Sequence, residues 1–270
     1  MSTPEGATRG LRLELPNEAV ALLRLDRPNV LNALTDDMVA EFGRLLDCVA
    51  ADTRVRVLVI TGEGRGFCAG FDLGLVADAP ASAELAETPA WMLRQEAFAS
   101  LVTRLRALRQ PVIAAVNGPA NGAGLGLALA CDVRIAGRSA RFNSAFVRVG
   151  LSSCDIGVSY LLPRCIGMTR AFELMLTGRM IDAAEADRIG LVSEVVDDER
   201  LLSRAMELAG MIVANSAFGV WMTKRGMWAN VEASSLQAAI ELENRTQIVA
   251  RTTGDMQRAV AAMNIKRSPN

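Results

Sequence analysis

The groups best suited to chemistry in this sequence belong to the backbone. Residues 112–116 are a short apolar run typical of a buried strand, and a glycine-rich turn at residues 121–124 leads from it into an apolar, helix-favouring run. The first N–H groups of a helix have no partner inside it, and the helix dipole favours negative charge there. Gly122 and Gly124 carry no side chain to keep a ligand away. The pattern predicts a site for a developing oxyanion, with the Ala123 N–H as donor.

Two other interpretations of this stretch have to be weighed. Small residues at a strand–turn–helix junction could serve close packing alone. The run from Gln110 to Cys131 has no charged residue, so a membrane span also has to be considered. Prolines, asparagines and glycines interrupt it, however, and a single helix would not survive them. We therefore expect buried globular core.

Composition bounds the class of protein. The chain has 270 residues, of which 51% are apolar and 22% charged, with a net charge of −1. This predicts an ordinary globular protein without electrostatic attraction to nucleic acid or membranes. Residues 1–10 are polar and lack the apolar core of a secretory signal, so we expect a cytoplasmic protein. The chain has no histidine, and no cysteines have zinc-site spacing, so we expect no metal.

Strand and helix patterns alternate along the first 200 residues. This alternation predicts an α/β domain, and the nearly all-helical pattern from Glu199 onward predicts a helical appendage. We expect strands within 11–25 (a hairpin), 55–60, 112–116, 133–136 and 191–195, and helices at 36–51 (capped by Thr35), 91–109, 125–131, from 158, 171–176 and 181–189.

Several motifs, in order, resemble the crotonase (enoyl-CoA hydratase/isomerase) family. They are Arg27-Pro28 with LNAL at 31–34, TGEGRGFCAGFDL at 61–73, PVIAAVNGPANGAGLGLALACDVRIA at 111–136, ARFNSAFVRVGL at 140–151 and LTGRMIDAAEADRIGLVSEVV at 176–196. The resemblance implies a crotonase-like spiral of ββα units with a C-terminal helical trimerisation region. We accordingly divide the chain into an acyl-CoA-binding core, 1–200, and a C-terminal helical region, 201–270.

The resemblance also implies the ligand and its contacts. The ligand would be an acyl-CoA thioester, whose coenzyme A is part of the substrate, so no separate cofactor is expected. The protein would assemble as a homotrimer or a dimer of trimers. The N–H groups of Ala69 and Ala123 would grip the thioester oxygen, and Lys224 or Arg225 could reach a phosphate on a neighbouring subunit. The other implied substrate or CoA contacts are Arg27, Gly70, Phe71, Asp72, Leu73, Gly122 and Phe146.

The chain departs from the family at the acids. Hydratases of the family use two glutamates around one water, and the matching positions here are Gly126 and Phe146. Neither side chain can move a proton, so paired-carboxylate hydration is not encoded at the usual places. Asp155, in LSSCDIGVSYLLPR, resembles the acid that dienoyl-CoA isomerases carry in this loop. Apolar neighbours could raise its pKa and let it shuttle a proton; alternatively, it only caps the helix that begins near Gly157.

Three functions remain open. The first is an enzyme that forms a CoA-thioester enolate and relocates a proton through Asp155, as an isomerase does. The second is an enoyl-CoA hydratase that uses a non-standard acid. The third is a catalytically silent acyl-CoA-binding protein that kept the oxyanion loops but lost the acids. The isomerase-like function is favoured because Asp155 resembles, by its position, a catalytic acid of the family.

Overall fold

The computed structural model describes residues 6–8, 10–75 and 87–267. The chain divides into two compact units, residues 1–210 and residues 211–270. The first unit carries both sheets and the helices that surround the expected site. The second consists of helices.

A seven-stranded mixed sheet forms the centre of the first unit. Its order is β1-β2-β3-β4-β5-β7-β10, antiparallel from β1 to β3 and parallel from β3 onward. Continuous apolar sequences make the central strands β4 and β5 buried throughout, as parallel strands covered on both faces require. The strands are β1 (Gly6–Thr8), β2 (Leu11–Asn17), β3 (Val20–Leu25), β4 (Val57–Gly62), β5 (Val112–Val116), β7 (Val133–Gly137) and β10 (Glu194–Val196).

A second, three-stranded sheet lies between the strands of the large sheet and the helices that follow them in the chain. It contains β6 (Pro119–Asn121), β8 (Arg141–Asn143) and β9 (Ile181–Asp182), with β6 parallel to β8 and β8 antiparallel to β9. A single bridge between Cys68 and Ala120 joins the segment after β4 to it. The chain therefore repeats a unit of large-sheet strand, small-sheet strand or bridge, and helix: β4–Cys68–α2, β5–β6–α3 and β7–β8–α4. The α/β fold of ββα units is confirmed.

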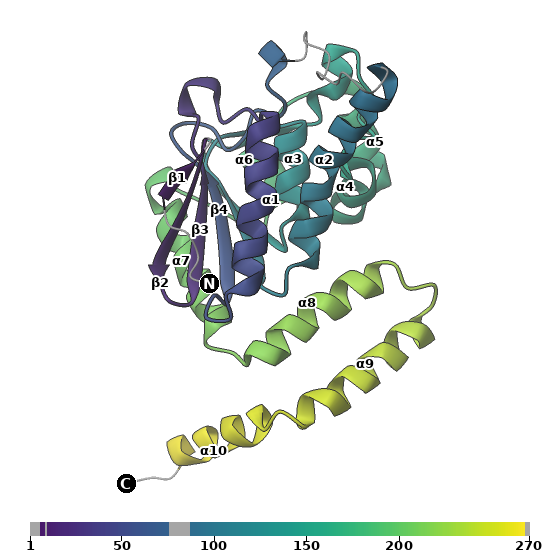
Figure 1. The fold of residues 1–270 in the computed structure, drawn as a ribbon. Coiled ribbons are helices and arrows are strands. Elements are labelled where there is room, and N and C mark those ends of the chain that lie inside the picture. Colours follow the sequence, from purple (N-terminus) through teal and green to yellow (C-terminus); the bar gives the residue numbers. More distant parts are fainter. Residues whose placement is uncertain (1–5, 9, 76–86, 268–270) are drawn as a thin grey trace. The chain divides into compact units, whose positions relative to one another are not determined.

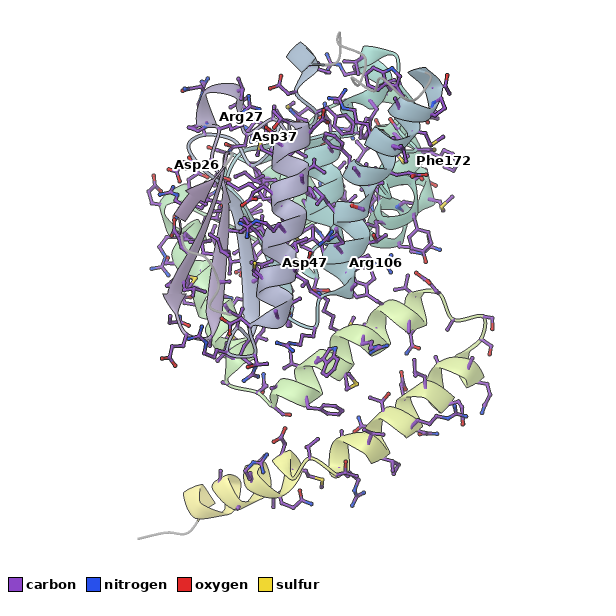
Figure 2. All side chains as sticks on the ribbon, viewed as in Figure 1. Asp26, Arg27, Asp37, Asp47, Arg106 and Phe172 are labelled. Carbon is purple, nitrogen blue, oxygen red and sulfur yellow. The ribbon has the colours of Figure 1, made fainter. Side chains whose placement is uncertain are left out.

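Helices cover the sheet in an ordered series. Contacts run from α1 to α2, α3, α4 and α5, and Figure 1 shows α1 and α7 on opposite sides of β2 and β3. Figure 2 places Arg27 and Asp37 at one end of α1 and Asp47 near the other. The helices are α1 (Asp36–Ala51), α2 (Glu87–Ala107), α3 (Ala123–Ala130), α4 (Val158–Ile166), α5 (Met168–Thr177), α6 (Ala183–Arg188) and α7 (Leu201–Val213), with 3-10 turns η1 (Pro28–Val30), η2 (Leu73–Leu75), η3 (Ala145–Val149) and η4 (Asp198–Arg200).

Local sequence explains several of these boundaries. The Thr35 hydroxyl accepts the Met38 N–H and caps α1, as predicted. The helix expected at 181–189 is preceded by a strand, β9, because Asp182 is itself the cap: its side chain accepts the Glu185 N–H. All residues of α3 are buried, which accounts for its lack of any polar side chain.

The second unit contains α8 (Ala217–Val231), α9 (Leu236–Arg251) and α10 (Asp255–Arg267). Ser216 and Ser235 cap α8 and α9 by accepting the N–H groups of Gly219 and Ala238. The role of this second unit in trimerisation stays a prediction. Within the described part of the chain no single helix is long and apolar enough to span a membrane, although one bent pair, Asp198–Val213 with Ala217–Val231, passes by length and composition.

Two asparagines fix the loop that follows β4. The fully buried Asn32 accepts the Arg27 N–H at 2.8 Å through Oδ1 and donates from Nδ2 to the Gly66 carbonyl at 2.8 Å. From the other side, Asn117 accepts the Gly62 N–H at 3.1 Å and donates to the same Gly66 carbonyl at 3.2 Å. The loop is thereby held before it delivers the segment 68–73.

Replacing Asn32 tests how much this fastening contributes. Asn32→Ala leaves a buried N–H and carbonyl unsatisfied, and we expect the free energy of unfolding to fall by about 2–4 kcal/mol. Asn29→Ala, at an exposed position in the same region, is the matched control and should change stability by less than about 0.5 kcal/mol. Urea denaturation of both variants measures this, and equal midpoints would contradict the assigned role of Asn32.

Candidate active site

The glycine-rich turn brings a free N–H to the start of a buried helix. Ala123 is the first residue of α3, and Gly122 before it has a φ of 49°, in the range that favours glycine. The Gly122 N–H donates to the Asn143 carbonyl at 3.0 Å. The Ala123 N–H donates to none of the described residues. Its use as an oxyanion donor stays a prediction, and the geometry leaves it available.

The expectation for Ala69 is wrong, because its N–H already has a partner. It donates to the Leu31 carbonyl at 2.9 Å and cannot also hold a substrate oxygen. Two residues on, Phe71 forms a parallel bridge with Leu34, made by Leu34 N–H to Gly70 O at 2.8 Å and Asp72 N–H to Leu34 O at 3.0 Å. In such a bridge the N–H of Phe71 itself points away from Leu34. It donates to none of the residues that the structure describes.

The two free N–H groups come from segments in close contact. A Cβ on Gly70 would lie 3.4 Å from the Ala123 nitrogen and 2.9 Å from the Asn121 carbonyl oxygen. A Cβ on Gly124 would lie 2.0 Å from the Cys68 carbonyl oxygen. Gly124 therefore serves close packing, as one of the two interpretations held, and this packing brings the first turn of α3 against the segment that carries Phe71.

Phenylalanine rings surround this point. The Phe71 ring packs edge-on against Phe98 of α2, with centroids 4.6 Å apart, and against Phe146 of η3 at 6.3 Å. The Phe146 ring also lies 3.5 Å from where a Cβ on Gly122 would be. Because these rings exclude water, N–H donors beside them interact more strongly with a developing charge than donors in solvent.

The buried thiol of Cys68 is not a candidate nucleophile in this site. Cys68 lies under the same segment, and burial raises the pKa of its thiol to about 12, which the Gly70 N–H only partly offsets. The thiolate is the nucleophilic form, so this thiol is inert at neutral pH. No group of three or more His, Cys, Asp or Glu side chains in the described ranges could hold a metal.

An apolar side chain fills the space one turn into α3. A Cβ on Gly126 would lie 2.5 Å from both Cγ1 and Cδ1 of Ile156. Ile156 is buried and has a φ of 32°, which is strained for a β-branched residue. The position that the family resemblance gives to a glutamate is thus a glycine covered by isoleucine.

Asp155 lies directly before this isoleucine and is half-buried. Its Oδ1 accepts the Ile156 N–H at 2.7 Å and the side-chain amide of Gln95. Burial raises the pKa of Asp155 above its ordinary value, although both hydrogen bonds act to lower it. The capping alternative is wrong: Gly157 is the N-cap of α4 and has no side-chain cap, and only the backbone carbonyl of Asp155 accepts the Val158 N–H, at 2.8 Å.

The remaining predicted contacts lie around the same loop or in the second unit. Arg27 donates from Nη1 to Asp72 Oδ2 at 2.9 Å and to the Ala33 carbonyl at 2.7 Å, which holds its guanidinium beside the 70–73 segment. Leu73 begins η2 and is exposed. Lys224 belongs to α8 of the second unit, and its contact with a phosphate stays a prediction.

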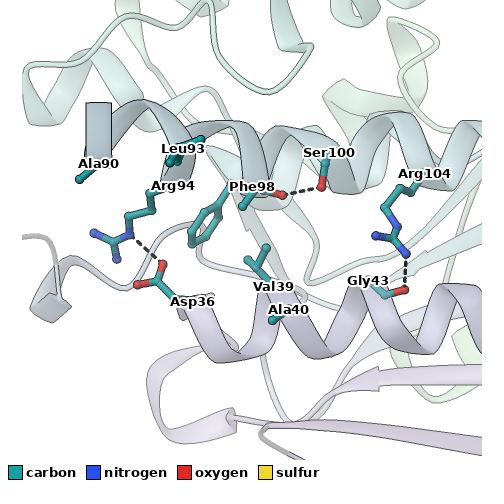
Figure 3. Close-up of a pocket in the computed structure, with 11 residues that line it drawn as sticks. Asp36, Val39, Ala40, Gly43, Ala90, Leu93, Arg94, Phe98, Ser100 and Arg104 are labelled. Carbon is teal, nitrogen blue, oxygen red and sulfur yellow. Dashed lines mark hydrogen bonds and ion pairs between the residues drawn. The ribbon is translucent and has the colours of Figure 1, made fainter. Parts of the chain in front are cut away.

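A pocket that the sequence did not indicate lies between α1 and α2. It has a volume of about 450 Å³ and is bordered by Phe98. Figure 3 shows Arg94 bonded to Asp36 at one end, with 2.7 Å between Nε and Oδ1, and Arg104 donating to the Gly43 carbonyl at 2.8 Å at the other. Phe98 thus borders this pocket and also contacts Phe71. No local sequence pattern could reveal the pocket, because the residues that face each other across it are 58 and 61 residues apart in the chain.

Sequence comparison identifies relatives along the whole chain. The model of the enoyl-CoA hydratase/isomerase family matches residues 16–270. A probable enoyl-CoA hydratase of Mycobacterium tuberculosis is 43% identical over 259 residues, covering 95% of this chain and 90% of that protein. The 1,2-epoxyphenylacetyl-CoA isomerase of Escherichia coli is 39% identical over 252 residues, covering 93% and 94%.

Solved structures agree in fold. A probable enoyl-CoA hydratase/isomerase from Mycobacterium abscessus has a TM-score of 0.89 and 40% identity, covering 95% of this chain and 96% of that one. A monofunctional enoyl-CoA isomerase from M. smegmatis has a TM-score of 0.74 and 43% identity, covering 86% and 99%. With its ββα repeat and this similarity along nearly its full length, the chain belongs to the enoyl-CoA hydratase/isomerase (crotonase) family of enzymes, which act on acyl-CoA thioesters.

Proposed function

We propose that this enzyme relocates a proton on an acyl-CoA thioester through an enolate, as an isomerase does. Asp155 is the acid and base, and the N–H groups of Phe71 and Ala123 hold the thioester oxygen. The observation that carries the proposal is the arrangement of Asp155 and Ile156: a half-buried carboxyl of raised pKa stands beside a side chain that fills the space at Gly126.

The two free N–H groups suit an enolate. Removal of a proton next to the thioester carbonyl moves negative charge onto its oxygen. Donors fixed in place before the reaction stabilise that charge without reorganisation, and the loss of one typically costs about 3–4 kcal/mol. The donors at Phe71 and Ala123 come from two segments that Gly70 and Gly124 hold in contact, so their spacing is set by backbone packing.

One carboxylate is sufficient for isomerisation. It takes a proton from one carbon, becomes a neutral acid, and returns the proton to another carbon as the enolate collapses, so no water enters the balance. The raised pKa of Asp155 brings it closer to that of a working acid and base at neutral pH.

Paired-carboxylate hydration is disfavoured by the same residues. At the two positions where the resemblance expects glutamates, Ile156 covers Gly126 and the Phe146 ring packs on Gly122. We propose that the two-glutamate mechanism has been lost here. Hydration with a non-standard acid remains the second candidate, because the M. tuberculosis relative is named a probable hydratase.

We further propose the path of the coenzyme A portion. It runs along the backbone of residues 69–73, beside the ion pair of Arg27 Nη1 with Asp72. We expect the Arg27 nitrogens other than Nη1 to contact a phosphate. Lys224 or Arg225, on the second unit, would supply a further cation in a trimer or a dimer of trimers.

Substitution of Asp155 tests the proposal directly. Turnover of 2-enoyl-, 3-enoyl- and dienoyl-CoA should be measured for wild type and Asp155→Asn, together with acyl-CoA binding by calorimetry. We expect one substrate to isomerise and Asp155→Asn to lose about 10²–10⁴-fold in kcat with binding retained. Asp187→Asn, an exposed aspartate, is the matched control.

The outcomes separate the candidate functions. Hydration of crotonyl-CoA by wild type, seen as loss of enoyl absorbance, would favour the hydratase. Binding without turnover by wild type would make this a silent acyl-CoA-binding protein. Full turnover by Asp155→Asn would exclude Asp155 as the acid and base.

The pH dependence provides a separate prediction. Asp155 begins the reaction as a carboxylate, so kcat/KM should fall as pH decreases through its pKa. Because burial raises that pKa, the acidic limb should lie above the usual range of an aspartate. A profile whose acidic limb lies in that usual range would contradict the proposal.

A double-mutant cycle tests whether Ile156 excludes a side chain at Gly126. Gly126→Ala should cost about 1–3 kcal/mol by overpacking, and Ile156→Ala about 2–4 kcal/mol by leaving a cavity. The double variant should be more stable than the sum predicts by at least about 1 kcal/mol, because one methyl fills part of the space the other vacates. Gly210→Ala, where a Cβ meets nothing within 4 Å, is the control, and strict additivity would contradict the contact.

A further inference from the structure

The carboxyl group of Asp155 has two unequal oxygens. Oδ1 accepts both hydrogen bonds, from the Ile156 N–H at 2.7 Å and from the side-chain amide of Gln95. Oδ2 accepts none from the part of the chain that the structure describes. Two donors on one oxygen fix the rotation of the carboxyl and leave the other oxygen open.

The Gln95 amide comes from a helix that also shapes the oxyanion region. Gln95 and Phe98 are three residues apart on α2 and therefore neighbours on its surface. Phe98 packs against Phe71, whose N–H is free, while Gln95 reaches Asp155. Further along α2, Val102 Cγ1 lies 3.4 Å from where a Cβ on Gly157 would be, so the helix follows the Asp155 loop into α4.

We propose that Gln95 is a positioning residue, whose amide holds Oδ1 of Asp155 and so makes Oδ2 the atom that exchanges the proton with the substrate. This rests on the proposed function of Asp155. The Oδ1 lone pairs are engaged by N–H donors, so the proton leaving the substrate carbon binds at Oδ2 and returns from it. Gln95 and Ile156 neither gain nor lose a proton in either step.

A neutral amide is the donor that this role needs. A lysine or arginine at position 95 would form an ion pair and hold the carboxyl ionised, whereas an amide fixes its rotation and lowers its pKa less than burial raises it. No charged group is among the causes of the shift of Asp155. Titratable side chains adjacent on α2 and α4 are Arg94, bonded to Asp36; Glu96, exposed; and Tyr160, on whose ring Arg164 stacks at 3.5 Å. The packed helix α3 has no ionisable residue.

The test is the pH profile of the full-length enzyme carrying Gln95→Met, which keeps the length of the side chain and removes the donor. We expect the acidic limb of kcat/KM to move up by about one pH unit, because the ionised carboxyl loses a hydrogen bond. We also expect kcat at the optimum to fall by about tenfold, with KM little changed, because Oδ2 is no longer aimed. Gln95 and Glu96 are both exposed, so Glu96→Met puts the same side chain on a neighbouring position of like exposure and should leave both unchanged.

A second variant and a second measurement test the role of Gln95 independently. Gln95→Asn retains a shorter amide and should move the limb in the same direction but less. The pKa of Asp155 can also be followed without turnover, as the ¹³C carboxyl resonance that disappears in Asp155→Asn. An unmoved limb and an unmoved resonance in Gln95→Met, with Asp155→Asn inactive, would overturn the role of Gln95 and leave the proposed function standing. Turnover by Asp155→Asn would overturn both.

Discussion

The close approach of the first turn of α3 to the segment 68–72 governs the site. There is no room for even one carbon between the Gly124 Cα and the Cys68 carbonyl, and Gly70 meets Asn121 almost as closely. Two backbone donors are therefore held by packed backbone instead of by side chains that could rotate. The side-chain amides of Asn32 and Asn117 both bond to the Gly66 carbonyl in the loop that leads into this contact. These bonds hold the loop to its neighbours and so help to fix the positions of the two N–H groups.

The side chains packed around these N–H groups are apolar. Ile156 and Phe146 occupy the space where the resemblance expects glutamates, and both are buried. In the proposed function, these apolar side chains strengthen the two backbone donors. Burial raises the pKa of Asp155, so a single carboxyl would suit proton transfer where two-glutamate hydration is disfavoured.

Sequence patterns predicted the parts that depend on local chemistry. The strand at 112–116 and the Thr35 cap follow from short-range propensities and were found as expected. The helix expected at 125–131 begins two residues earlier, at Ala123, after a short strand at Pro119–Asn121 that was not predicted. Ala69 was misassigned because the free N–H is decided by pairing with Leu34, a contact across more than 30 residues that no local pattern reveals. The same holds for Ile156 against Gly126 and for Gln95 against Asp155, which join segments 30 and 60 residues apart.

Helix α2 is fastened at both ends to α1 and carries, on one stretch, the ring against Phe71 and the amide on Asp155. In the proposed function, a bulkier acyl group that displaced this helix would disturb the oxyanion donors and Asp155 together. Under the proposed function, α2 would therefore couple the size of the bound acyl group to proton transfer. Under the same function, a mutation that displaced α2 to admit larger substrates would also slow proton transfer, and compensating changes on α4 or in the loop before it would be needed to restore the rate.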